Sequence, residues 1–292
     1  MKPSLFDYSS PASVEEVVAA LSADPSAMIL AGGQSLVPAM NLRLASPTRL
    51  IDLKNVADLG NISIENGVIK IGAMVRHRDL ELDDHAHAAN PLIREMMQFV
   101  AHVPIRNRGT IVGSICHADA AAEMPLLLVL TGGTVTAVGQ NGSREIAASE
   151  FFQFHMTTSR APDEMILSAN IPSLPKGAGY AFHEFARRHG DYAIAAAGAI
   201  VGLDGDHRVS QARVGACGVA STPVVLEAVE QTIIGAKLSK ETIADAAEKA
   251  KDAVTAPDDM HASTRYRKHL LAGLVRRVLS EAGERAAGGA TR

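Results

Sequence analysis

The chain has 292 residues, of which 47% are hydrophobic and 21% charged, as is typical of a globular protein with a sizeable core. This length favours two domains, or one large domain with subdomains. The formal net charge of −4 gives no basic footprint for nucleic acid, so we expect no such partner. No apolar run reaches the ~20 residues of a membrane span, and the polar start does not resemble a signal peptide, so we expect a cytoplasmic protein.

The first elements in chain order are those of a small parallel α/β unit. Ser13 followed by Glu16 has the pattern of a capping box, which predicts that a helix begins after Ser13. Short apolar segments at 27–31 and 50–53 predict two buried strands. The order of helix, strand, loop, helix and strand predicts a first subdomain over about residues 1–57.

From about residue 60 the sequence predicts hairpins instead. Glu65-Asn66-Gly67 lies between alternating residues and predicts a hairpin over 62–71, and Asn141-Gly142 predicts another. Residue patterns predict helices at 92–103, 123–130, 227–234, 239–254 and 263–284, and strands at 166–171, 193–203 and 213–219. The Pro- and Gly-containing linker at 172–177 predicts a boundary between a domain over 1–175, with its second subdomain at 58–175, and a C-terminal domain over 176–292.

Side chains that could ligate a metal are few or scattered. Two cysteines, Cys116 and Cys217, are too few for a disulfide framework or for the four thiolates of an iron–sulfur cluster. Any such cluster in an assembly must therefore belong to another chain. The close histidine pairs, such as His85 with His87, have no carboxylate or thiol that completes a ligand set, so we expect no metal site.

Two glycine-containing segments carry the strongest functional signal. They are Ile29-Leu30-Ala31-Gly32-Gly33-Gln34-Ser35-Leu36 and Gly109-Thr110-Ile111-Val112-Gly113-Ser114. Where side chains are absent, a backbone can approach an anion and direct several N–H groups at it, and the hydroxyl groups add donors. Two such loops in one domain predict a diphosphate held from both sides, and hence a dinucleotide-type cofactor. Neither segment has the Rossmann or Walker A spacing, which argues against NAD on a Rossmann fold and against ATP chemistry.

With their flanking residues, the two segments resemble those of the FAD-binding subunits of molybdenum hydroxylases. This family includes the carbon monoxide dehydrogenase medium subunit and the flavin domain of xanthine dehydrogenase. The resemblance continues in order along the chain, at 105–114, His117-Ala118-Asp119, Glu123-Met124-Pro125, 187–193 and Tyr266-Arg267. It implies an α+β fold, in which a two-subdomain FAD-binding domain of the vanillyl-alcohol-oxidase (PCMH) type precedes a smaller C-terminal α+β domain of the carbon monoxide dehydrogenase flavoprotein type.

The resemblance also implies roles for single residues. FAD would lie extended between the two N-terminal subdomains, with its diphosphate bound by segments 29–36 and 109–114. Glu123 would accept hydrogen bonds from a cofactor hydroxyl. The hydrophobic residues Val100 and Ile166 would pack on the rings of the cofactor. Tyr192 would lie near the isoalloxazine, where an aromatic ring can stack or gate access.

Two residues depart from the family pattern. Val112 stands where the family usually has glycine, and a β-branched residue disfavours a positive φ at that place. His183 stands where related proteins often carry lysine, so it would tune the charge of the flavin only when protonated. We expect FAD to bind nonetheless.

The resemblance implies a chain that carries electrons rather than one that acts on the organic substrate. A large molybdopterin subunit would oxidise the substrate, and a small subunit with two [2Fe–2S] clusters would relay electrons to the FAD of this chain, in a dimer of heterotrimers. Carbon monoxide, aldehydes, purines and N-heteroaromatics remain open as substrates, and the analogy favours the last. Quinone, cytochrome, oxygen and NAD remain open as acceptors, with the lack of a second nucleotide signature against NAD.

Two alternative functions remain on the sequence. A stand-alone flavin oxidoreductase would share the two segments but would need its own substrate pocket with a catalytic side chain. The sequence shows no obvious surplus site of that kind. A flavin-free assembly subunit would retain the fold without the cofactor, and Val112 alone favours it. Retention of flavin after purification distinguishes these classes.

Overall fold

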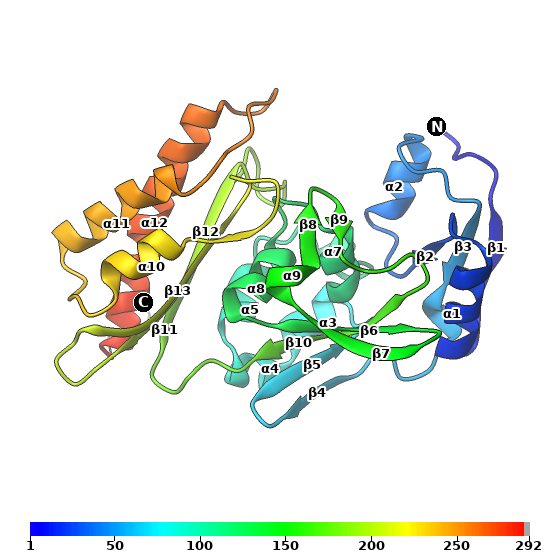
Figure 1. Ribbon diagram of the computed structural model, residues 1–292, viewed down its shortest axis with the longest axis horizontal. Coiled ribbons are helices and arrows are strands. Elements are labelled where there is room, and N and C mark those ends of the chain that lie inside the picture. The colour runs from blue at the N-terminus through cyan, green and yellow to red at the C-terminus, as the bar shows by residue number, and fades with distance from the viewer. Residues whose placement is uncertain (289–292) are drawn as a thin grey trace.

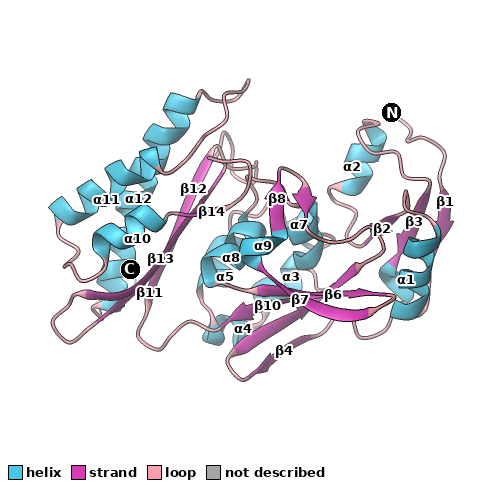
Figure 2. Cartoon of the chain, in the orientation of Figure 1, coloured by secondary structure: helices cyan, strands magenta, loops and turns pink. Residues whose placement is uncertain are grey.

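The computed structural model describes residues 1–288, which form three units along the long axis of the molecule (Figure 1). The N-terminal unit (residues 7–55) contains a three-stranded sheet, the middle unit (residues 62–172) a five-stranded sheet with helices around it, and the C-terminal unit (residues 179–286) a four-stranded sheet (Figure 2). Among the described residues, no helix is both long and apolar enough to cross a membrane. This mixture of helices and separate sheets confirms the predicted α+β class.

The N-terminal unit is the parallel α/β unit that the sequence predicts. Its strands β1 (Asp7–Ser9) and β2 (Met28–Leu30) both pair in parallel with β3 (Arg49–Asp52). Its helical elements are α1 (Val14–Ala23), α2 (Leu36–Asn41) and the 3-10 turn η1 (Leu53–Asn55). The Ser13 side chain caps α1 by accepting from the N–H of Glu16 at 3.2 Å, and the Glu16 carboxylate reaches back to the N–H of Ala12 at 2.8 Å.

The middle unit is built on an antiparallel sheet of order β4-β5-β10-β6-β7. The strands are β4 (Ile62–Glu65), β5 (Val68–Gly72), β10 (Met165–Pro172), β6 (Thr134–Gly139) and β7 (Gly142–Ala147). Both predicted hairpins are confirmed, because β4 pairs with β5 and β6 with β7. Helices around the sheet are α3 (His77–Leu82), α4 (Asp84–Ala89), α5 (Leu92–Met97), α6 (Val103–Arg106), α7 (Ile111–His117), α8 (Glu123–Thr131) and α9 (Ala148–Phe151), with a small pair of strands β8 (Phe152–Phe154) and β9 (Thr157–Thr158).

The single helix predicted over 92–103 is wrong. Helix α5 ends at Met97, and a separate turn of helix, α6, starts at Val103. The break precedes Pro104, which lies in the first turn of α6, where a proline is tolerated. The chain instead turns at Ala101, which has a left-handed φ of 43°.

The C-terminal unit is an antiparallel sheet of order β11-β12-β13-β14 with helices on one face. The strands are β11 (Gly179–Phe185), β12 (Ala195–Leu203), β13 (Val209–Cys217) and β14 (Val224–Val225), and the helices α10 (Glu227–Ile233), α11 (Lys240–Asp252) and α12 (Thr264–Ala286). Strand β11 is not among the predicted elements. It pairs with β12 along its whole length and forms one edge of the sheet.

The open face of the C-terminal sheet packs against α5 and α8 of the middle unit. Phe182 on β11 belongs to the same hydrophobic core as α5 and α8, whereas Ala181 belongs to the core beneath α12. Polar contacts also join the two units, because Arg285 of α12 donates to the Glu95 carboxylate at 2.7 Å. The other Glu95 oxygen accepts from the N–H of Phe182 at 2.8 Å.

Candidate cofactor site

The first glycine segment (residues 29–36) connects β2 to α2 and leaves several donors unused. Gly33 has a left-handed φ of 72°, which glycine adopts without a steric penalty. Among residues 1–288, no hydrogen bond has the backbone N–H of Gly33, Gln34 or Ser35 as its donor. Ser35 precedes α2 without a side-chain capping bond, and its side chain interacts with that of Tyr192. The segment therefore presents consecutive donors of the kind that an anion binds.

The second glycine segment (residues 109–114) is largely the first turn of a helix, not a loop as predicted. Thr110 caps α7, and its side chain accepts from the N–H of Gly113 at 3.1 Å. Ile111, Val112, Gly113 and Ser114 therefore all have helical backbone, which buries Ile111 and Val112 in the core. Because Val112 has no positive φ, a glycine at this place is not required for the backbone conformation.

The two glycine segments are in direct contact, as the prediction of one shared site requires. A Cβ atom on Gly32 would lie 2.5 Å from the carbonyl oxygen of Arg108, 2.6 Å from the Cα of Gly109 and 2.9 Å from the nitrogen of Thr110. Only a residue without a side chain fits between these backbone atoms. The contact joins the N-terminal unit to the middle unit at the place where the free donors lie.

A buried polar cluster that was not predicted from the sequence packs against the second glycine segment. The imidazole of His77 lies 3.0 Å from the place of a Cβ on Gly109. Burial, and then the charge of Arg106, lowers the pKa of His77 to about 4, so its ring is neutral at physiological pH. Arg106 is buried as well and donates to Glu81 at 3.0 Å, to the carbonyl of Val100 at 2.8 Å and to that of Ala101 at 3.1 Å.

A cavity of about 1000 Å³ lies between the middle and C-terminal units. It is lined by residues that include Asp119, Phe154, His155, Arg187, Tyr192, Ile194, Gly218, Pro257, His261 and Arg267. Tyr192 is half exposed, and burial around its hydroxyl together with the charge of Asp119 raises the pKa of Tyr192 to about 12. A hydrogen bond with the Ser35 side chain acts in the opposite direction. Tyr192 therefore reaches across to the first glycine segment.

Two carboxyl groups meet at the same interface, behind Asp119. Glu123 begins α8 and is 5% exposed, and its carboxyl group lies close to that of Glu184 on β11. Burial is the main cause that raises the pKa of both carboxyl groups above the ordinary value. The charge of Glu123 further raises the pKa of Glu184. Glu123 is among the residues predicted for the site, whereas no role was predicted for Glu184.

The structure does not bring His183 to this group of residues. Its Nε2 lies 2.8 Å from a Glu281 oxygen on α12, which covers the opposite face of the C-terminal sheet. Val100 is 7% exposed and is held by Arg106, and Ile166 is 3% exposed beside a register shift in β10. Ile29 and Leu30 are half-buried in β2, which leads into the first glycine segment.

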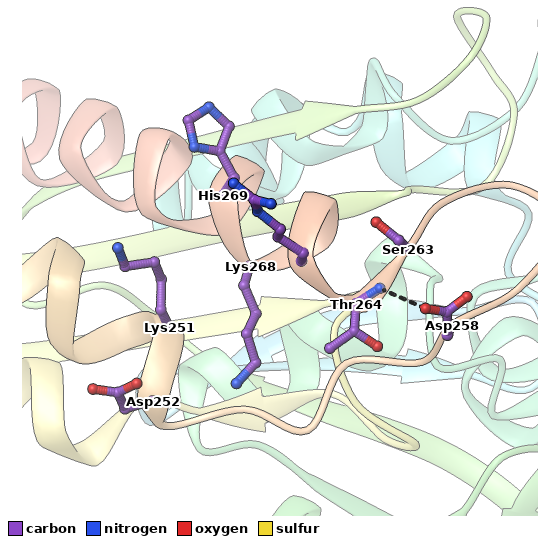
Figure 3. Close-up of a pocket in the computed structure, with 8 residues that line it drawn as sticks. Lys251, Asp252, Asp258, Ser263, Thr264, Lys268 and His269 are labelled. Carbon is purple, nitrogen blue, oxygen red and sulfur yellow. Dashed lines mark hydrogen bonds between the residues drawn. The ribbon is translucent and has the colours of Figure 1, made fainter.

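A second cavity, of about 750 Å³, lies at the start of α12, on the side of the sheet away from both glycine segments (Figure 3). Its lining combines the cations Lys251, Arg265 and Lys268 with Asp252 and Asp258. In Figure 3 the labelled side chains of Lys251, Lys268 and Asp258 do not converge on one point. The Thr264 N–H already donates to Asp258 at 3.5 Å. This cavity is therefore not part of the cofactor site.

Comparisons with known proteins define the class of this fold. Residues 4–174 match the family model described as the FAD-binding domain in molybdopterin dehydrogenase. Residues 180–282 match that of the CO dehydrogenase flavoprotein C-terminal domain. The three units thus form a flavoprotein with an FAD-binding part followed by a C-terminal part.

Individual relatives cover the chain almost completely. Subunit alpha of the 6-hydroxypseudooxynicotine dehydrogenase complex of Paenarthrobacter nicotinovorans is 41% identical, over 98% of this chain and 97% of its own. The carbon monoxide dehydrogenase medium chain of Afipia carboxidovorans is 36% identical, over 98% and 99%. The structure of quinoline 2-oxidoreductase from Pseudomonas putida 86 aligns with a TM-score of 0.94 at 36% identity, over 98% of this chain and 99% of the matched chain. The chain therefore belongs to the family of flavoprotein medium subunits of molybdenum-containing dehydrogenases.

Proposed function

We propose that this chain is the FAD-carrying medium subunit of a heterotrimeric molybdenum hydroxylase in the cytoplasm. It would take electrons from the [2Fe–2S] clusters of a small subunit, while a large molybdopterin subunit oxidises the organic substrate. The observation that carries this proposal is the contact of Gly32 with Gly109, beside three backbone donors that have no acceptor within residues 1–288. This arrangement suits a diphosphate that lies between two subdomains.

The positions of several residues predicted for the site support particular roles. The amides of Gly33, Gln34 and Ser35 and the Ser35 hydroxyl would bind the diphosphate, and Gly109 and Gly113 would allow its close approach from the second segment. Thr110 would act indirectly, because its hydroxyl already caps α7. The flavin supplies the redox chemistry when bound, and the protein binds, orients and electrostatically tunes it. Tyr192 and Glu123 would contact the cofactor from the interface between the units.

The relatives support the further assignments. Two of the three reported relatives are named for nitrogen-containing aromatic substrates or their derivatives, so we propose an N-heteroaromatic substrate for the whole enzyme. That substrate would bind to the large subunit, because no catalytic constellation for it was predicted in this chain. We place the domain boundaries at 57/58 and 175/176, and propose a dimer of heterotrimers that delivers electrons to an external acceptor.

The test is the visible spectrum of the chain, purified alone and after coexpression with its large and small partner subunits. We expect about one FAD per chain in the complex, identified by its mass after release. The double variant Gly33→Val/Ser35→Ala should lose this FAD but keep its circular dichroism spectrum. A Val side chain at a φ of 72° is strained, and it would occupy space needed by the diphosphate.

Other results would favour the alternative functions. A colourless complex that fails to take up added FAD would indicate a flavin-free assembly subunit. FAD together with oxidation of an organic substrate by the isolated chain would indicate a stand-alone flavin oxidoreductase. Normal FAD content in the double variant would contradict the role of the first glycine segment.

A further inference from the structure

The two carboxyl groups of Glu123 and Glu184 meet across the interface without a cation. Neither residue takes part in any ion pair among residues 1–288. Glu123 is 5% exposed, and Glu184 Oε2 is buried without a partner in the described part of the chain. The charge of Glu123 acts on Glu184 and raises the pKa of its carboxyl group. Two carboxylates in contact, away from water, cannot both be ionised at little cost, so the pair must hold a proton near neutral pH.

The groups around the pair do not supply a counter-charge. Asp119, from the loop before α8, adds a further negative charge beside Glu123. Cys217 on β13 is fully buried, and burial raises its pKa well above the ordinary value, so its thiol is neutral. The hydroxyl of Tyr192 is neutral for the same reason. Asp119, Cys217 and Tyr192, the groups on neighbouring elements that interact with the pair, are therefore acidic or uncharged.

The surroundings of the two carboxyl groups decide which of them holds the proton. Glu123 stands at the first residue of α8, where the helix N-terminus favours negative charge, and a backbone N–H hydrogen bond stabilises its carboxylate. Glu184 lies on a β-strand, where no such donor reaches its buried Oε2. The proton therefore belongs on Glu184, which donates it in a hydrogen bond to the Glu123 carboxylate.

We propose that Glu184 is a positioning residue, which stays protonated at neutral pH and orients the Glu123 carboxylate toward bound FAD. This inference rests on the proposed function, in which Glu123 accepts a hydrogen bond from a cofactor hydroxyl. A protonated Glu184 leaves the pair with a single negative charge beside the flavin. When the pH rises, Glu184 loses its proton to solvent, and a second negative charge appears at the same place.

Strand geometry explains why Glu184 occupies this position. Side chains alternate along β11, so His183 and Glu184 point to opposite faces of the sheet. His183 pairs with Glu281 under α12, whereas Glu184 faces α8 beside Phe182, which packs in the core of the middle unit. His183 was predicted to tune the flavin, but its neighbour Glu184 is the residue whose side chain lies at the interface.

The experiment measures the midpoint potential of FAD in the coexpressed complex as a function of pH. The variant Glu184→Gln keeps a neutral hydrogen-bond donor to Glu123 but has no proton to lose. Negative charge beside the flavin disfavours its reduction, so the wild-type potential should fall more steeply than that of Glu184→Gln above neutral pH. Below neutral pH the potentials of the wild type and Glu184→Gln should agree. The exposed residue Glu65 provides the control variant Glu65→Gln, which should follow the wild type.

A second variant separates orientation from charge. Glu184→Ala removes the donor, so the dissociation constant of FAD should rise about tenfold, the typical effect of one hydrogen bond to a charged group. Glu184→Gln should stay near the wild-type value. If FAD binding weakens equally in Glu184→Ala and Glu184→Gln, the assignment of the proton to Glu184 is overturned. The infrared carbonyl band of a protonated carboxylic acid, expected in the wild-type complex at pH 7 and lost in Glu184→Gln, tests that proton directly.

The outcomes distinguish this inference from the proposed function. If the wild-type and Glu184→Gln complexes both bind FAD and their potentials depend on pH identically, the inference is overturned and the proposed function stays intact. A wild-type complex without that infrared band would overturn the inference as well, even if the variants fail to fold. A wild-type complex without FAD would contradict the proposed function itself.

Discussion

A Cβ on Gly32 would lie 2.6 Å from the Cα of Gly109, so the N-terminal and middle units touch backbone to backbone where the free amides lie. We therefore expect Gly32→Ala to push the two glycine segments apart. The affinity for FAD should fall at least about tenfold, because a small error in position weakens several hydrogen bonds at once. Equilibrium titration of the apoprotein with FAD, followed by fluorescence, measures this loss.

Gly60 offers the matched control for this variant. A Cβ on Gly60 would meet nothing within 4 Å, and its φ is not in the left-handed region. Gly60→Ala should therefore bind FAD like the wild type. If both variants bind FAD normally, the contact between the segments has no part in cofactor binding.

Tyr192 should influence electron transfer more than cofactor retention. Tyr192→Ala removes the ring at the interface cavity, and we expect FAD to remain bound while its potential or the rate with an external acceptor changes severalfold. Tyr192→Phe keeps the ring and should have a smaller effect. Tyr8 is exposed to the same degree, 51% against 52%, so Tyr8→Ala is the control. An unchanged rate and potential in Tyr192→Ala would mean that Tyr192 contributes only to packing.

His77 should make the protein sensitive to acid. The folded protein holds this ring neutral down to about pH 4, whereas in the unfolded chain it takes up a proton near 6.5. The unfolded state therefore binds more protons as the pH falls from 6.5 toward 4, and stability is lost over that range, by up to about 3 kcal/mol. His77→Phe should remove this part of the loss in urea denaturation at pH 7 and pH 4.5. Replacement of the exposed His85 by Phe should leave this loss of stability unchanged.

The Glu123–Glu184 pair should make the folded protein less stable as the pH rises, whereas His77 makes it less stable as the pH falls. Both carboxyl groups have raised pKa values in the folded protein, so the folded state holds more protons than the unfolded state above the ordinary carboxyl pKa. Stability should therefore decline as the pH rises from about 5 through neutrality. In Glu184→Gln the decline should be shallower, as denaturation midpoints at pH 6 and pH 9 would reveal. An equal decline in both proteins would mean that the pair holds no proton.

Local signals in the sequence were enough for much of the fold. The Asn66-Gly67 turn and the cap at Ser13 act within a few residues, so the hairpin and helix α1 were predicted correctly. The second glycine segment has the composition of a loop because glycine and β-branched residues are weak helix formers. Burial of Ile111, Val112 and Ile115 in the core makes that segment helical all the same.

Contacts between distant parts of the chain could not be predicted from local signals in the sequence. Whether His183 or Glu184 faces the cofactor depends on which side of β11 each neighbouring unit covers, and a shift of one residue reverses the answer. The support of Gly109 by His77 and of the Val100 turn by Arg106 likewise depends on packing between separate helices. Residues 92–103 contain no glycine or proline, so the end of α5 at Met97 had no local signal.

The ion pair of Arg285 with Glu95 spans 190 residues of sequence. During synthesis, α5 and the sheet of the middle unit can fold long before α12 emerges from the ribosome, since domains generally fold as units from the N-terminus. The interface that holds Tyr192 and Glu184 can close only when α12 arrives. The face of the middle unit that the C-terminal sheet later covers is thus open to solvent in the nascent chain, where a chaperone would find it accessible.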